Sequence, residues 1–134
     1  MDIPPLAYFA GIIDGEGSIM LGKKRKVQRF RWPAVSVTST THCLVELCQR
    51  RFGGSISRQT KAKPHHKQGW VWQVYNDSAL ECLKKVVRHL QEPEKRRRAV
   101  LLLNEYKELT PRNGKYTKDM VAAKLDFERR FFGE

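Results

Sequence analysis

The spacing of apolar residues changes several times along the chain, and each change predicts a new element. Residues 6–14 (LAYFAGIID) have apolar side chains at helical spacing, so we expect a short helix that ends at Gly15 and Gly17. Apolar and polar residues then alternate, which predicts two strands over 18–26 and 29–39 with a basic turn between them. The first part of the chain is therefore expected to be a helix followed by a β-hairpin.

The second part of the chain repeats this order. A helix is predicted over 42–52, and strands over 54–60 and 70–75. Three further helices are predicted at residues 78–90, 94–109 and 117–132. The order α-β-β-α-β-β-α with helical additions indicates a mixed α+β fold, with antiparallel strands and helices on one face of the sheet.

The charge of the chain favours a polyanionic partner. Lys and Arg number 26 against 14 Asp and Glu, which gives a net charge of +12 in 134 residues. Between residues 16 and 77 twelve basic residues stand against one acidic residue, and they gather in the two predicted hairpins. A single basic turn would equally protect a sheet edge, but two basic hairpins in one domain favour a nucleic-acid surface.

Several other classes of protein are disfavoured. No segment approaches the roughly 18 apolar residues of a spanning helix, and the N-terminus does not resemble a signal peptide. The three cysteines form no CxxC pair, so neither a disulfide framework nor a zinc module is indicated. We expect one soluble, intracellular domain over residues 1–134, and the organelle, bacterial cytoplasm and phage-infected cytoplasm all remain open as its compartment.

The end of the first predicted helix carries an unfavourable charge. Asp14 and Glu16 lie at the partly negative C-terminal end, where acidic side chains cost a few tenths to about 1 kcal/mol each. We therefore expect a compensating positive charge that the sequence does not itself supply.

This helix also has two distinct faces. At about 100° per residue, the large apolar side chains gather on one side: Leu6, Phe9, Ile12 and Ile13. The opposite side is small: Ala7, Ala10, Gly11 and Asp14. Such a face suits the close approach of another backbone, either inside the same domain or in a partner.

Residues 9–17, FAGIIDGEG, closely resemble the nine-residue signature of the LAGLIDADG homing endonucleases. The predicted order of elements resembles the single-motif subunit of that family to about residue 109. The resemblance implies a core over about residues 4–109 with a saddle-shaped antiparallel sheet. The helix at about 117–132 is then an accessory.

The resemblance also implies a role for each motif position. Phe9, Ile12 and Ile13 enter the core. A dimer contact with the same helix of a second copy uses Ala7, Ala10, Gly11 and Asp14, since one motif in the chain implies a homodimer. Glu16, in place of the signature's aspartate, is the metal ligand, assisted by the carbonyl of Gly15. Oxygen ligands without His or Cys favour Mg²⁺.

The implied function is a sequence-specific, intron-encoded double-strand DNA endonuclease that hydrolyses phosphodiester bonds on a long, nearly palindromic site. Lys95 is the candidate basic residue near the scissile phosphate, with Arg96 or Arg97 as alternatives. Ser39 corresponds to a further polar position, although a capping or surface role fits it equally. An intron RNA maturase or a catalytically silent DNA-binding protein is the alternative function.

DNA recognition is expected from the strands, because a twisted antiparallel ribbon fits the major groove. Alternation assigns one face to the core: Ile19, Leu21, Val35, Val37, Ile56, Trp72 and Val74. Together with the hairpin turns, the other face gives the predicted DNA-contacting residues: Lys24, Lys26, Arg29, Arg31, Ser36, Thr38, Ser57, Arg58, Gln59, Lys61 and Gln73. Among these, Arg29, Arg31 and Arg58 break the alternation.

Overall fold

The computed structural model describes residues 2–22, 30–61 and 63–134. The predicted DNA contacts Lys24, Lys26 and Arg29 lie outside these ranges. Along the described residues the elements are α1 (Leu6–Glu16), β1 (Gly17–Gly22), β2 (Trp32–Ser39), α2 (His42–Phe52), β3 (Ser55–Arg58), β4 (Trp70–Tyr75), α3 (Asn76–Val86), a 3₁₀ turn η1 (Val87–His89), α4 (Pro93–Glu105) and α5 (Lys118–Phe132).

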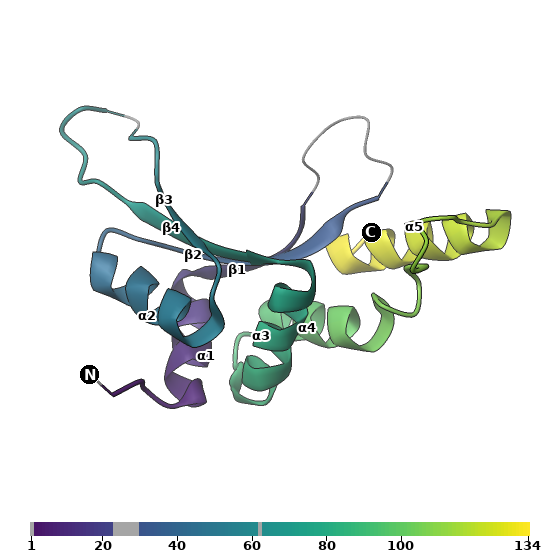
Figure 1. Cartoon of the computed structure of the whole chain (residues 1–134), viewed down its shortest axis with the longest axis horizontal. Coiled ribbons are helices and arrows are strands. Elements are labelled where there is room, and N and C mark those ends of the chain that lie inside the picture. Colours follow the sequence, from purple (N-terminus) through teal and green to yellow (C-terminus); the bar gives the residue numbers. More distant parts are fainter. Residues whose placement is uncertain (1, 23–29, 62) are drawn as a thin grey trace.

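The four strands form one antiparallel sheet in the order β1-β2-β4-β3. Helices α1 to α4 cover one face of this sheet, and the other face is open and curved, with the β3–β4 connection rising at one side (Figure 1). The α+β prediction is therefore confirmed. No helix in the described part of the chain is long and apolar enough to cross a membrane.

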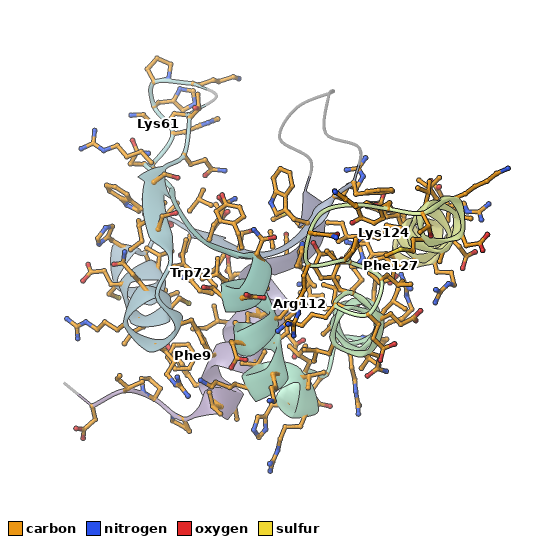
Figure 2. All side chains as sticks on the ribbon, turned by 45° about the vertical axis from the view of Figure 1, so that its right-hand side comes forward. Phe9, Lys61, Trp72, Arg112, Lys124 and Phe127 are labelled. Atoms are coloured by element: carbon orange, nitrogen blue, oxygen red, sulfur yellow. The ribbon has the colours of Figure 1, made fainter. Side chains whose placement is uncertain are left out.

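The helix-covered face of the sheet carries the core that alternation predicted. Trp72 is fully buried and donates a hydrogen bond from Nε1 to the Gly53 carbonyl at 2.7 Å. Phe9 of α1 packs in the same core; in Figure 2 Trp72 lies close to the strands and Phe9 lies lower, among the helices. Of the seven residues assigned to this face, Ile56 on the edge strand β3 is only partly buried.

The first helix extends further than its glycines suggested. It continues through Gly15 to Glu16, and Gly17 forms its C-cap, with its N–H bonded to the Ile13 carbonyl. A side chain at Gly17 would bring a Cβ within 2.8 Å of the Ile13 Cα and 3.1 Å of the Ser36 carbonyl oxygen. The helix can therefore lead directly into β1 only with glycine at this position.

The last helix, α5, packs against α4 through side chains of several kinds. Phe127 and Phe131 are fully buried, and Arg130 forms a bidentate ion pair with Glu105, with both N–O distances at 2.8 Å. Arg97 donates to the carbonyls of Arg130 and Phe131 at 2.8 and 2.6 Å, which satisfies groups at the end of α5. These contacts fix α5 as part of the folded domain.

A lysine is buried in this α4–α5 interface. Only 1% of Lys124 is exposed; its ammonium donates to the Thr110 hydroxyl and lies 4.0 Å from the centre of the Tyr106 ring. Burial lowers the pKa of Lys124 from 10.5 to about 8, and the nearby Glu128 carboxylate opposes this shift. Figure 2 shows Lys124 beside Phe127.

This lowered pKa makes stability depend on pH. Between pH 8 and 10.5, Lys124 keeps its proton in the unfolded chain but has released it in the folded chain. The contribution of this residue to the free energy of unfolding therefore rises with pH, by about 2 kcal/mol from pH 7 to 9.5. We expect Lys124→Met to lack this contribution and to be more stable at pH 7, because no charge is desolvated. Urea unfolding of both proteins at the two pH values measures the difference. Equal pH dependence in both would contradict the prediction.

Candidate active site

The end of α1 presents an exposed carboxylate next to the sheet. Glu16 is the last residue of α1, and the chain enters β1 at the following residue. Glu16 and Gly15 are both exposed. Within the described ranges, no group of three or more His, Cys, Asp or Glu side chains is placed to hold a metal ion.

Lys95 provides positive charge at the end of α1. Its Nζ donates to the carbonyl oxygens of Ile13 and Asp14, at 3.0 and 2.6 Å. The expectation that the compensating charge is missing from the chain is therefore wrong in part, because α4 supplies this ammonium. The sequence around α1 does not reveal this contact, because Lys95 lies about 80 residues further along the chain.

The two alternatives to Lys95 are placed differently. The guanidinium of Arg97 binds the Arg130 and Phe131 carbonyls and the Glu94 carboxylate. Arg96 is exposed. Lys95 is thus the member of this basic run whose side chain contacts the helix that carries Glu16.

Asp14 binds within its own chain. Its carboxylate accepts hydrogen bonds from the backbone N–H groups of Gln91 and Glu92, at 2.9 and 3.2 Å. The carboxylate of Glu92 in turn accepts from the N–H of Lys95 at 2.6 Å and caps α4. These bonds tie Asp14 to the start of α4, and its contact with a second copy stays a prediction.

Ala7, Gly11 and Gly15 form a stripe of small residues on the exposed side of α1, which also carries Tyr8, 42% exposed. A Cβ at Gly11 or Gly15 would meet no atom within 4 Å. Ala10 is fully buried in its own chain, so its prediction as a dimer contact is wrong. Gly15, which the resemblance assigned to the metal, is exposed on the same side of the helix as Ala7 and Gly11 because positions four residues apart differ by only about 40°.

Ser39 is engaged in a turn. Its Oγ accepts a hydrogen bond from the Thr41 N–H at 3.0 Å, just before α2 begins. In the sheet it lies two positions beyond Val37, the residue that pairs with Gly17. The hydrogen bond to Thr41 therefore supports the structural alternative for Ser39, a capping role.

The open face of the sheet carries most of the predicted DNA contacts within the described ranges. Ser57, Gln59 and Lys61 are exposed, and Thr38 and Gln73 are half-buried. Lys61 lies near the top of the β3–β4 connection in Figure 2. Ser36 differs, because it is only 8% exposed between its neighbours on β1 and β4, which limits its reach to a ligand.

The two described arginines that break the alternation both contact their own chain. Arg31 lies 5.1 Å from the centre of the Phe132 ring, and its backbone N–H donates to Glu128 at 3.0 Å. Arg58 lies 5.6 Å from the centre of the Trp70 ring. Packing against these aromatic rings explains why neither follows the pattern of the open face.

Comparison with protein-family models and with curated proteins gives no match to this sequence. Solved structures do match. The homing endonuclease I-CvuI is 19% identical with a TM-score of 0.69, over 95% of this chain and 79% of that chain. I-CeuI is 19% identical with a TM-score of 0.62, over 98% and 68% of the two chains. The LAGLIDADG homing endonuclease I-LtrWI is 18% identical with a TM-score of 0.60, over 93% of this chain and 43% of that chain. The chain therefore has the fold of the LAGLIDADG homing endonucleases, the family that residues 9–17 resemble.

Proposed function

We propose that the chain is a sequence-specific double-strand DNA endonuclease of the homing type, acting as a homodimer with a divalent metal. The observation that carries this proposal is the position of Glu16: an exposed carboxylate stands where the small stripe of α1 meets the start of the sheet. I-CvuI, I-CeuI and I-LtrWI, which share the fold, were each solved in complex with DNA.

Duplex DNA is the proposed substrate for the open face of the sheet. A net charge of +12 favours a polyanion, and exposed Ser57, Gln59 and Lys61 continue this face into the β3–β4 connection. Antiparallel strands fit the width of the major groove, where outward side chains reach base edges. Two copies related by a two-fold axis would then read a long, nearly palindromic site.

Dimerisation is proposed through the α1 stripe of Ala7, Gly11 and Gly15. The three residues are exposed, and a Cβ at Gly11 or Gly15 would meet no atom of its own chain within 4 Å. A two-fold contact of this face brings two copies of Glu16 together, although each chain has only one. The lengths of the matched chains agree with this, because the chain spans 79% of I-CvuI but only 43% of I-LtrWI, which is long enough to hold a second such unit.

The donor atoms at the end of α1 fit a hard divalent cation. Glu16 offers carboxylate oxygens and Gly15 a carbonyl oxygen, and both residues are exposed. A cation bound there would polarise the phosphate and make a bound water more acidic, which is the chemistry that phosphodiester hydrolysis needs. We propose Mg²⁺, and I-CvuI was solved with DNA in the presence of Mg and of Ca.

The neighbouring residues position the end of the helix that carries Glu16. Lys95 uses two of its three N–H bonds on the carbonyls of Ile13 and Asp14, and we propose that the third faces a phosphate oxygen or the attacking water. Asp14 fixes the start of α4 and with it Lys95. Glu16 and Lys95 are therefore the proposed catalytic pair, and Asp14 is a positioning residue.

Removal of the Glu16 charge tests the enzymatic part of the proposal. We expect Glu16→Gln to lower cleavage of candidate insertion-site DNA by at least about 100-fold in the presence of Mg²⁺, because a neutral amide is a poor ligand for a hard cation. DNA affinity, measured by gel shift, should change little. Glu81→Gln is the matched control, since it removes an exposed carboxylate on α3.

A Glu16→Gln protein that still cuts would overturn the assignment of the ligand. Specific DNA or intron RNA binding by the unmodified chain, without cleavage, would instead favour the silent or maturase alternative.

A bulky side chain in the α1 stripe tests the dimer. Gly11→Leu places its side chain in open space within one chain, so the fold is retained, but the side chain blocks the approach of a second helix. We expect monomers by analytical ultracentrifugation and loss of double-strand cleavage. Ala122→Leu, at an exposed position of α5, should leave the dimer intact. An unchanged dimer in Gly11→Leu would exclude this contact.

A further inference from the structure

Two large polar side chains stand next to each other on the open face of β4. Gln73 and Tyr75 are two residues apart and therefore point to the same side, opposite to buried Trp72 and Val74. The Tyr75 hydroxyl donates a hydrogen bond to Oε1 of the Gln73 amide. Tyr75 is 44% exposed although it is a large aromatic residue. Alternation identified Gln73 as a DNA contact but did not include Tyr75.

The neighbours of this pair are small. Gln73 is flanked by Ser36 on β2 and Ser55 on β3, and Tyr75 by Ala34 on β2. Ser36 and Ala34 are only 8% and 2% exposed. The side chains of Gln73 and Tyr75 therefore extend further from the sheet than those of their neighbours, and a ligand on this face would contact these two first.

The bond from Tyr75 fixes which way the amide faces. A glutamine amide has one oxygen that accepts and one nitrogen that donates two hydrogen bonds. When Oε1 is turned toward the tyrosine hydroxyl, Nε2 and its two N–H groups are turned away from it. Gln73 then presents donors to whatever lies on the sheet.

We propose that Tyr75 positions Gln73 as a donor that reads a guanine in the major groove. This inference rests on the proposed function, namely that DNA lies on the open face. Guanine shows two acceptors in the groove, O6 and N7, which match the two N–H groups of Nε2. Tyr75 acts through Gln73 and is a positioning residue for base specificity.

Adenine is the base that a free glutamine normally recognises. That pairing needs Oε1 to accept from the adenine N6 amino group while Nε2 donates to N7. Because the bond from Tyr75 uses one of the two lone pairs of Oε1 and turns this oxygen toward the hydroxyl, the pairing with adenine is weakened in this chain. Loss of the hydroxyl in Tyr75→Phe releases Oε1 and restores it.

The experiment is a binding selection from a randomised pool of duplex DNA, without divalent cation, using the whole chain and its Tyr75→Phe and Gln73→Ala variants. The unmodified chain is expected to select guanine at one position of each half-site. We expect Gln73→Ala to lose the preference at this position in both half-sites. Tyr75→Phe should shift that same position toward adenine by roughly five-fold or more and leave the other positions unchanged. Equal thermal unfolding midpoints show that both variants keep the fold.

The possible outcomes separate this inference from the proposed function. If Tyr75→Phe selects the same site as the unmodified chain, or if Gln73→Ala changes no position, the inference is wrong while specific DNA binding stands. If Tyr75→Phe lowers the preference at every position alike, Tyr75 is only structural and the inference is again wrong. If the unmodified chain enriches no sequence, DNA recognition by this face fails, and both proposals fall together.

Discussion

The contact between the end of α1 and the start of α4 determines the geometry of the candidate site. Lys95 binds the last carbonyls of α1, and Asp14 binds the first N–H groups before α4, so each helix end is neutralised by a side chain from the other. Glu16 projects from this junction, two residues after Asp14. The backbone that carries Glu16 is therefore positioned by contacts with α4 as well as by its own helix.

The sheet depends on the same junction. Gly17 follows Glu16 directly and pairs with Val37 in the next strand, so the position of α1 sets the position of β1. The strands then divide the molecule into a buried face, which supports the helices, and an open face, which carries polar side chains. A substitution that moves α1 therefore shifts Glu16 and the open face of the sheet together.

Much of this arrangement was predictable from local pattern. Alternation assigned six of the seven core residues of the sheet correctly, and residues 9–17 identified the fold. The rest depends on contacts distant in sequence. Asp14 meets residues 91 and 92, and Arg31 meets Phe132, partners that no periodicity reveals. The burial of Ala10 likewise depends on how α1 packs against the rest of the core, which its own periodicity does not reveal.

Lys124 illustrates a further limit of sequence patterns. In the sequence it is one basic residue on an amphipathic helix, where charged side chains are normally solvated, yet the structure encloses it against Tyr106 and Thr110. Its burial follows from how α5 meets α4, and both helices must be placed before that contact can be seen.

The attachment of α5 has a consequence for protein engineering. Glu128 of α5 holds the backbone of Arg31 just before β2, and Arg98 of α4 binds the Ile19 carbonyl of β1 while its guanidinium stacks on Phe131. Strands β1 and β2 are thus attached to α4 and α5 by side-chain contacts. Transplanting the β1–β2 strands alone into a related scaffold would remove these supporting contacts, so the appropriate unit for such a graft is the two strands together with α4 and α5.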